Sequence, residues 1–305
     1  MLKRASQSTN AALLRLVLPV ILIWGGNFAV MRVGVNEVGP YCLAVMRFLI
    51  ASVPMVFFVR RPAVPFTFIV AYSLTFGLGQ FGPLFLGIKL GLPSGMASLL
   101  VQLQVVFTPI LVFFVLGQGV PAATVTAIII SLIGLGTIIF SSTGSGAGSV
   151  PVLLGAAAAF SWGASNVVVA WGSARGYRYN PVALVIWASS LLPAPFLVLA
   201  LLTGEADGIT FHGVLPALFP AVYLGLIATV VAYHFWVKAL SMFPATSVAP
   251  FSLLIPIIGL LLGHMIFGET PTTSEALGSF LVVGGVIIHM AGLRIQALRL
   301  RQVTR

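Results

Sequence analysis

The sequence predicts an all-α, polytopic membrane protein with ten transmembrane helices arranged as two inverted five-helix repeats. Three observations carry this prediction: scarce charge, ten long apolar runs, and an echo between the two halves of the chain. Of 305 residues, 59% are hydrophobic and only 7% are charged. Soluble domains carry about 25% charged residues, so this chain could not cover a water-exposed surface. A soluble enzyme, a disordered chain and a secreted disulfide scaffold are thereby excluded.

Ten apolar runs are each long enough to cross a bilayer. A helix needs roughly 20 apolar residues to span about 30 Å of hydrocarbon, and the runs are unbroken rather than alternating, which excludes membrane strands. We expect the spans at residues 11–31, 41–59, 64–88, 95–116, 121–140, 150–171, 181–202, 211–237, 245–267 and 273–292.

The basic residues predict the orientation of these spans. Of 15 Lys and Arg residues, Arg32 and Lys89 fall in outer loops and Arg47 within a span, which leaves twelve in cytoplasmic segments when the N-terminus is inside. Positive charge marks cytoplasmic loops. We therefore expect a multi-pass protein of the cell inner membrane with both termini in the cytoplasm. The net charge of +10 then reflects topology, and we expect no nucleic-acid partner.

The halves of the chain echo each other across a Gly/Ser stretch at residues 141–149. Trp24-Gly25 recurs as Trp162-Gly163, and Pro93, Gly117 and Gly134 recur 151 residues later as Pro244, Gly268 and Gly285. Five spans in each half mean that the second half enters the membrane from the opposite side, as in alternating-access carriers. We expect a first repeat at residues 1–140, a linker at 141–149, a second repeat at 150–293 and a basic cytoplasmic tail at 294–305.

Several short motifs resemble the EamA family of the drug/metabolite transporter superfamily. They are Trp24-Gly25-Gly26-Asn27-Phe28, Arg47-Phe48, Phe160-Ser161-Trp162 and Gly268-Glu269. Residues 80–81, 95–108, 184–187 and 248–260 are similar to the branch of this family that exports cysteine and O-acetylserine from bacteria. One departure is Gly117-Gln118, where many members repeat Gly-Glu. The resemblance implies ten helices around a central cavity and the export of small metabolites, typically amino acids.

Polar residues at matching positions of the first and sixth spans are candidate substrate ligands. Trp24 and Asn27 lie three residues apart, so they share a helix face, and Trp162 and Asn166 form the equivalent stripe. An amide can bind both the ammonium and the carboxylate of a zwitterion. The alternative is that these side chains pack helix against helix. Because the pair recurs, we expect Asn27 and Asn166 to face one cavity near the membrane midplane.

Three glutamines extend the candidate site. Gln80 lies in the third span, and Gln102 and Gln104 lie in the fourth. An unpaired amide is costly in hydrocarbon, so each should face protein or water. Gln102 and Gln104 are two residues apart and cannot share a helix face, so we expect one to line the cavity and the other to bond a neighbouring helix. For Gln80 a helix–helix hydrogen bond and a substrate contact both remain open.

Ionisable groups within the spans are few, and none is acidic. Arg47 is within reach of snorkelling to the interface or of bonding backbone carbonyls, and the alternative is that it binds a substrate carboxylate. His234 lies next to Tyr233, and because an imidazole can exchange protons at physiological pH it could relay a proton, although a hydrogen-bonded helix histidine is more common. Arg47, Tyr233 and His234 complete the candidate substrate-binding set. We expect no metal site and no cofactor, since the chain has one cysteine and no acid within its spans.

The sequence therefore predicts a secondary transporter that exports small metabolites, amino acids or their derivatives, by alternating access. Its partners are the lipid bilayer and a small-molecule substrate, and a homodimer is left open. A carrier for another solute, such as a nucleotide sugar or a drug, is the alternative within the superfamily. An intramembrane enzyme would need a nucleophile with a base or a metal cluster, which the sequence does not offer, so we expect no enzymatic activity.

Overall fold

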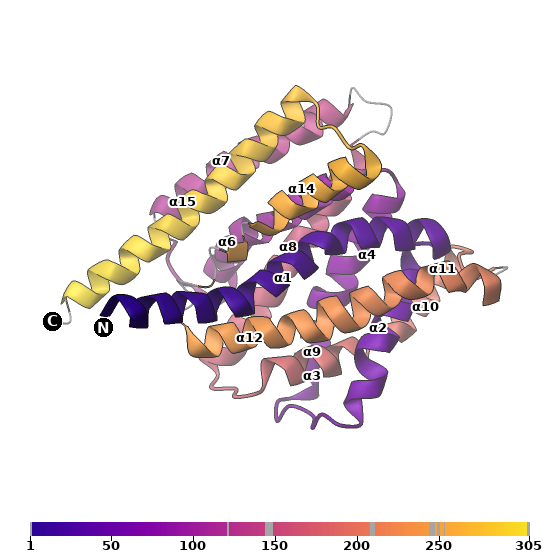
Figure 1. Ribbon diagram of the computed structural model, residues 1–305, viewed down its shortest axis with the longest axis horizontal. Coiled ribbons are helices and arrows are strands. Elements are labelled where there is room, and N and C mark those ends of the chain that lie inside the picture. The colour runs from indigo at the N-terminus through magenta and orange to yellow at the C-terminus, as the bar shows by residue number, and fades with distance from the viewer. Residues whose placement is uncertain are drawn as a thin grey trace.

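The computed structural model describes residues 2–120, 122–143, 149–207, 211–243, 248, 251–252 and 254–303. Within these ranges the chain forms helices and loops without any strand. Figure 1 shows the helices packed as an elongated bundle. Residues 144–148 of the predicted linker 141–149 and parts of the predicted span 245–267 lie outside the described residues.

The helices of the first half correspond to the first five predicted spans. They are α1 (Leu2–Val38), α2 (Pro40–Val56), α3 (Phe66–Tyr72), η1 (Ser73–Leu78), α4 (Gly79–Lys89), α5 (Ser94–Leu100), η2 (Val101–Leu103), α6 (Gln104–Leu116) and α7 (Ala122–Thr143). Segments α3, η1 and α4 join into one membrane-length helix, and so do α5, η2 and α6. The first helix begins nine residues before the predicted span 11–31 and ends seven after it.

The helices of the second half correspond to the other five predicted spans. They are α8 (Val150–Ala174), α9 (Pro181–Ser189), α10 (Pro193–Leu202), α11 (Phe211–Val222), η3 (Tyr223–Val231), α12 (Ala232–Met242), α14 (Leu254–Phe267) and α15 (Thr273–Val303). In the described ranges, eight helices are long and apolar enough to cross a membrane, and two shorter apolar helices, α2 and α14, accompany them. The prediction of an all-α, polytopic membrane fold is confirmed.

Two wide π-helical turns, η1 and η3, lie in the third and eighth spans and begin 150 residues apart, at Ser73 and Tyr223. Each π turn inserts an extra residue per turn and shifts the side chains that follow it around the helix. Proline also removes a helix hydrogen bond nearby, at Pro83 in α4 and at Pro220 in α11. These turns therefore rotate α4 and α12, which carry Gln80 and Tyr233, relative to the preceding helices.

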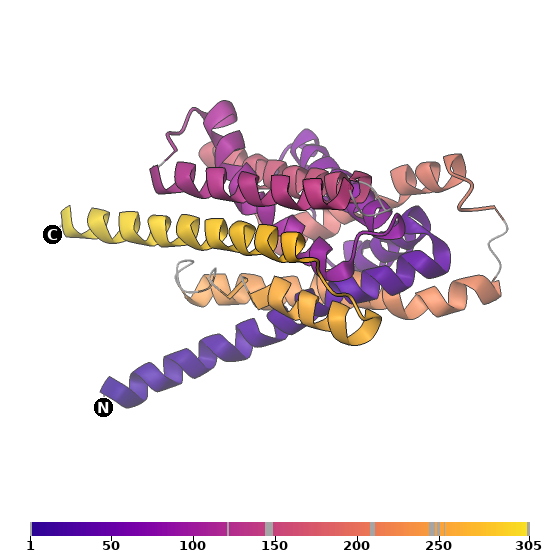
Figure 2. The same ribbon diagram turned by 90° about the horizontal axis from the view of Figure 1, so that it is seen from above.

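Helices α7 and α15 lie side by side along one edge of the bundle (Figures 1 and 2). Small residues allow this contact: a Cβ on Gly134 would lie 2.6 Å from the Gly278 carbonyl oxygen, and one on Gly278 would lie 2.7 Å from that of Gly134. Close backbone approach through small residues is how membrane helices gain van der Waals contact without a hydrophobic driving force. Helix α7, the last span of the first half, thus packs against α15, the last span of the second half.

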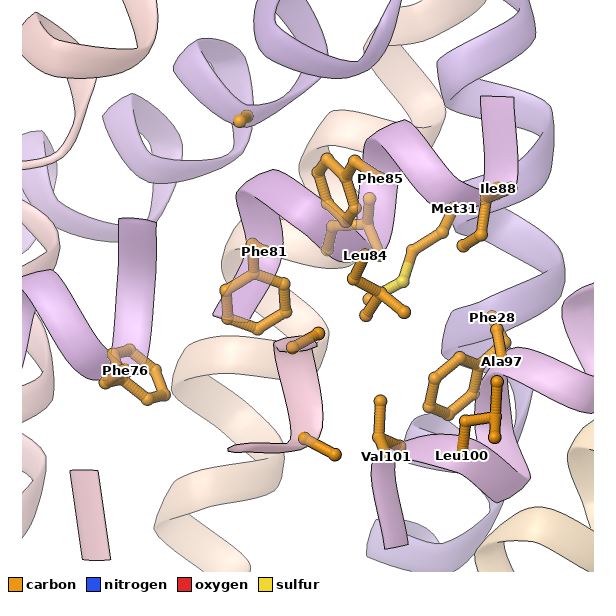
Figure 3. Close-up of a cluster of buried hydrophobic side chains, with 14 of the residues drawn as sticks. Phe28, Met31, Phe76, Phe81, Leu84, Phe85, Ile88, Ala97, Leu100 and Val101 are labelled. Atoms are coloured by element: carbon orange, nitrogen blue, oxygen red, sulfur yellow. The ribbon is translucent and has the colours of Figure 1, made fainter. Parts of the chain in front are cut away.

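Aromatic side chains from both halves fill the core. Phe48 of α2 stacks on Phe196 of α10 at a centroid distance of 5.7 Å and meets Phe81 of α4 edge-on at 5.6 Å. Phe48, Phe85 and Phe196 are fully buried. Beside this cluster, Phe28, Met31, Leu84 and Val101 turn towards a common space between α1, α4 and η2 (Figure 3). That space belongs to the central cavity.

Candidate functional site

A narrow cavity of about 60 Å³ lies in the middle of the bundle. Pockets for drug-sized ligands measure about 300–1,000 Å³, so a substrate can enter only when the surrounding helices move apart. Segments of both halves contribute side chains to its wall. The lining residues are Trp24, Asn27, Phe28, Met31, Arg47, Phe76, Gln80, Phe81, Leu84, Val101, Gln102, Trp162, Ala228, Tyr233 and Ile255.

Arg47 is the cation of this cavity. Its side chain is only 3% exposed, so it does not snorkel to the interface. Nη2 donates to Thr229 Oγ1 at 3.2 Å, and the guanidinium carbon lies 3.9 Å from the centre of the Phe81 ring. Nε and Nη1 have no hydrogen-bond partner, and within the described residues the ion pair found is the one between Arg32 and Glu269. A buried charge without a counter-ion is costly, which makes Arg47 a ready partner for an anion.

The backbone around Thr229 explains how Arg47 is held. Gly225 has no side chain, and a Cβ there would lie 2.5 Å from the Arg47 carbonyl oxygen, so α2 can approach η3 closely. Thr229 Oγ1 also donates to the Leu224 carbonyl at 2.8 Å across the π turn. Sequence reasoning missed Thr229, because a threonine in an apolar run carries no sign of the widened turn that aims it at α2.

Two amide oxygens in the cavity wall lack hydrogen-bond partners. Asn27 on α1 is 8% exposed and Gln80 on α4 is 4% exposed, and neither Asn27 Oδ1 nor Gln80 Oε1 accepts a hydrogen bond. Gln102 Nε2 donates to the Ser252 carbonyl at 3.4 Å. Buried amides usually satisfy their hydrogen bonds, and each orphan costs on the order of 1–3 kcal/mol. The free oxygens are therefore acceptors available to a donor such as an ammonium group.

Three aromatic residues line the cavity, and Trp24 ties α1 to the second half. Trp24 Nε1 donates to the Ala228 carbonyl at 2.9 Å, and its ring meets the Tyr233 ring edge-on at 5.4 Å. Trp162 of α8 adds an indole to the wall. Trp24 and Trp162, which occupy echoed positions, thus both reach the cavity.

Gln104, Asn166 and His234 do not line the cavity. Asn166 Nδ2 donates to Gln104 Oε1 at 2.6 Å and to Thr108 Oγ1 at 3.0 Å, so these residues link α8 to α6. A Cβ on Gly163 would lie 3.1 Å from Phe107, which places α6 directly against this face of α8. The expectation that Asn27 and Asn166 share one cavity is thus not what the structure shows. His234 is exposed on the outside of α12.

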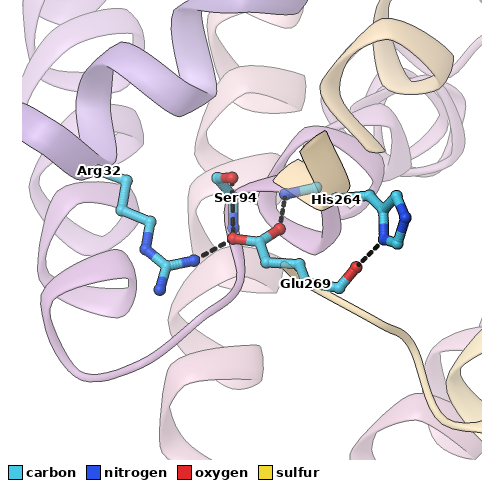
Figure 4. A network of polar contacts seen from close by, with 5 residues as sticks. Arg32, Ser94, His264 and Glu269 are labelled. Carbon is cyan, nitrogen blue, oxygen red and sulfur yellow. Dashed lines mark hydrogen bonds and ion pairs between the residues drawn. The ribbon is translucent and has the colours of Figure 1, made fainter. Parts of the chain in front are cut away.

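A second set of polar contacts closes one end of the bundle. The Glu269 carboxylate follows α14 and accepts hydrogen bonds from the Ser94 and Gly95 amides at 2.7 and 2.9 Å, at the start of α5. It also pairs with Arg32 of α1, and His264 Nδ1 lies 3.1 Å from the Glu269 carbonyl oxygen (Figure 4). The positive end of the α5 dipole adds to this attraction.

Glu205 makes an equivalent contact at the same end. It follows α10 and accepts hydrogen bonds from the Tyr41 and Cys42 amides at 2.8 and 3.1 Å, at the start of α2. Gly39 has φ 84°, and a Cβ there would lie 2.7 Å from the Glu205 carboxylate. Burial raises the pKa of Glu205, and the two amide hydrogen bonds lower it in part. Both carboxylates therefore join the second half to helix starts of the first.

Several known proteins are similar to this chain over almost its full length. A "Probable amino-acid metabolite efflux pump" of Salmonella typhimurium is 35% identical over 285 residues, which cover 92% of this chain and 95% of the relative. A protein of Escherichia coli K12 with the same description is 33% identical over 284 residues, again 92% and 95%. A "Probable terminal-alkyne amino-acid exporter" of Streptantibioticus cattleyicolor is 25% identical over 92% of this chain and 93% of its own length.

A solved crystal structure has the same fold, with a TM-score of 0.58 over 93% of this chain and 99% of that chain, at 18% sequence identity. The model of the EamA-like transporter family matches the chain twice, at residues 11–140 and 149–291. The chain belongs to the EamA-like transporter family.

Proposed function

We propose that this protein exports small amino-acid metabolites across the cell inner membrane, with the central cavity as the substrate site. The observation that carries the proposal is the buried Arg47 guanidinium. Among the residues that the structure describes, two of its nitrogens have no partner and it has no counter-ion, and the same cavity holds unpaired amide oxygens. The names of the Salmonella and E. coli relatives support the substrate class.

The chemistry of the cavity suits a zwitterion. A carboxylate at Arg47 would form a charge-assisted hydrogen bond in a site of low dielectric constant. The ammonium group would donate to Asn27 Oδ1 and Gln80 Oε1, and the rings of Trp24, Trp162 and Tyr233 would enclose the rest of the molecule. Each orphaned group of the wall would then gain a partner.

Alternating access follows from the same architecture. We propose that residues 1–140 and 150–293 are inverted repeats, that both termini face the cytoplasm, and that the cavity opens to one side at a time. The paired matches of the family model and the π turns 150 residues apart support the repeats. The cavity of about 60 Å³ then corresponds to a nearly closed state, from which either end must open.

The Arg47→Gln variant tests the substrate role. We expect it to weaken substrate binding on the order of tenfold to a hundredfold, since a hydrogen bond to a charged group contributes roughly 1.5–3 kcal/mol. The thermal stability should not fall, because the variant removes a buried charge that has no counter-ion in the described ranges of the chain. Counterflow of cysteine and O-acetylserine in proteoliposomes measures the affinity, and a melting curve in detergent measures the stability. Unchanged affinity would disprove the role of Arg47.

Asn27 and Asn166 form a matched pair of amides with different surroundings. We expect Asn27→Ala to weaken substrate binding by about 1–3 kcal/mol, because a cavity acceptor is lost. Asn166→Ala should lower the thermal stability and leave the affinity of the folded protein unchanged, because its partners are Gln104 and Thr108. Equal affinity losses in both variants would place the substrate elsewhere.

A further inference from the structure

A second, larger cavity lies away from the central one. It has a volume of about 420 Å³ and forms a groove on the side of the bundle between α3, α6 and α8. Its floor is one face of α8, where Ala164, Val167, Val168 and Trp171 recur at helical spacing. Phe68 of α3 and Val115 of α6 stand in opposite walls.

The groove is apolar and open to the lipid phase. Val115 is 56% exposed, and Thr67 and Pro65 on the facing wall are exposed as well. From Ala164 to Trp171 the floor runs about 10 Å along α8, at 1.5 Å per residue. That is most of the depth of one leaflet, about half of a 30 Å core. The shape therefore fits an acyl chain that enters from one surface of the membrane.

Two arginines stand at the mouth of the groove. The Arg175 guanidinium lies 3.6 Å from the centre of the ring of Trp171, a lining residue. The Arg61 guanidinium lies 5.5 Å from the centre of the Phe66 ring, and Phe66 is the sequence neighbour of the lining residues Pro65 and Thr67. Both side chains are exposed and have no hydrogen bond or ion pair within the described residues. Stacking on a ring occupies the face of a guanidinium and leaves its N–H groups free at the edge.

The charge around the mouth is uniformly positive. Arg60 and Arg178 lie beside the stacked arginines in sequence, in the same two loops. The acids lie at the other end of the bundle, at the end of α1, after α10, after α14 and at the start of α15. They are Glu37, Glu205, Asp207, Glu269 and Glu275. A free cationic rim over an apolar groove is complementary to a lipid with an anionic headgroup.

We propose that the groove between α3, α6 and α8 binds one anionic phospholipid, with an acyl chain along α8 and its phosphate between Arg61 and Arg175. This site is separate from the central cavity, since the two share no lining residue. The lipid would fill a space that otherwise has no side chain in it. It would also hold the α2–α3 loop against the α8–α9 loop.

Native mass spectrometry of the detergent-solubilised protein tests the proposal, with phosphatidylglycerol and phosphatidylcholine as probes. We expect one phosphatidylglycerol molecule to bind more tightly than phosphatidylcholine. Arg61→Ala and Arg175→Ala should each weaken phosphatidylglycerol binding about fivefold, since one arginine near a lipid surface contributes roughly 1 kcal/mol. Lys89→Ala, which removes a cation at the other end of the bundle, is the control and should change nothing.

A second pair of variants tests the groove itself. Val115→Trp fills one wall and should weaken the binding of both lipids, whereas Phe114→Trp alters a neighbouring side chain outside the groove and should not. Equal affinity of the wild-type protein for the two lipids would overturn the proposal. So would displacement of phosphatidylglycerol by inorganic phosphate, which would indicate a headgroup site alone, or by O-acetylserine, which would indicate a substrate path. The wild-type titration decides the matter even if a variant fails to fold.

Discussion

The two ends of the bundle differ in how their charges are used. At one end, which we call the acidic end, Glu205 and Glu269 of the second half bind backbone amides and Arg32 of the first half. At the other, the basic end, Arg61 and Arg175 lie against aromatic rings and form no ion pair in the described part of the chain. At the acidic end, carboxylates of the second half bind the first half of the chain. At the basic end, arginines from both halves carry charge of the same sign and therefore repel one another.

Two helices, one ending at each end of the bundle, are followed by glycines in the same conformation. Gly117 ends α6 and Gly268 follows α14, both with φ 65°, and each donates its amide to the carbonyl four residues earlier. The glycine conformation is thus the same at both ends, and at the acidic end the Glu269 amide also donates to the Gly263 carbonyl at 3.2 Å. The next residue is Gln118 at the basic end, where it is exposed, and Glu269 at the acidic end, where it joins α5 and α1. Both helices thus end at a glycine in the same conformation, but only at the acidic end does the next residue link the two halves of the chain.

This asymmetry has a consequence for transport. Opening the acidic end breaks the Arg32–Glu269 ion pair and the amide hydrogen bonds of Glu269 and Glu205. Opening the basic end breaks the hydrogen bond from Trp187 Nε1 to the Val59 carbonyl but no ion pair within the described residues. We therefore expect the resting protein to favour opening at the basic end, which is the cytoplasmic side in the proposed orientation.

The largest effect is expected from Glu269→Ala. It leaves Arg32 and the Ser94 and Gly95 amides without their acceptor, at a cost of roughly 2–4 kcal/mol for charge-assisted bonds. The acidic end should then open more often. In a Cys42→Ser background, a cysteine in place of the buried Met96 should react faster with a thiol reagent added from outside.

Glu275→Ala is the matched control for Glu269. It removes another carboxylate at the acidic end, but within the described residues this carboxylate accepts its hydrogen bond from the nearby Thr272 amide, at 2.8 Å. This local cap stabilises the start of α15. The contact of the cap with α7 is made by Thr272, whose Oγ1 lies 3.2 Å from Ser141 Oγ and which the variant leaves in place. An equal rate of thiol labelling in the two variants would mean that Glu269 does not hold the acidic end closed.

A smaller effect is expected from the pH. Burial raises the pKa of Glu205 above its ordinary value of 4.5. The folded protein then binds more protons than the unfolded chain just above that pH, so its stability should fall as the pH rises through this window. Glu205→Gln keeps an acceptor for the Tyr41 amide and should remove that slope. Melting curves of both proteins between about pH 4 and pH 7 measure it, and identical slopes would contradict the role of Glu205.

The smallest effect is expected from Gln118→Glu. The side chain is exposed, and an exposed ion pair contributes about 0–1 kcal/mol, so a carboxylate at the basic end should barely change the stability. Counterflow should continue at close to the wild-type rate. A large loss of transport would show that an acid after α6 can tie the halves together as Glu269 does, and the two ends would then be equivalent.

The sequence by itself determined the class of the molecule and where its helices lie. Hydrocarbon requires about 20 apolar residues per crossing and internal hydrogen bonding, so the apolar runs predict where the helices lie. Span 273–292 is one example, since α15 begins at Thr273. The runs do not predict how far a helix continues beyond the apolar run, since α1 begins nine residues before its predicted span and α15 ends eleven residues after its own. Rare polar residues within such runs also had to avoid lipid, which is why Arg47, Asn27 and Gln80 could be singled out.

Only the tertiary structure decided which of these polar residues meet. Asn27 and Asn166 occupy echoed positions in the sequence, yet Asn27 lines the cavity and Asn166 bonds Gln104, because α6 packs directly against that face of α8. Likewise, Thr229 reaches Arg47 through a π turn that the sequence does not mark. Helical periodicity states which residues share a face, but the neighbour of that face depends on packing between segments far apart in the chain.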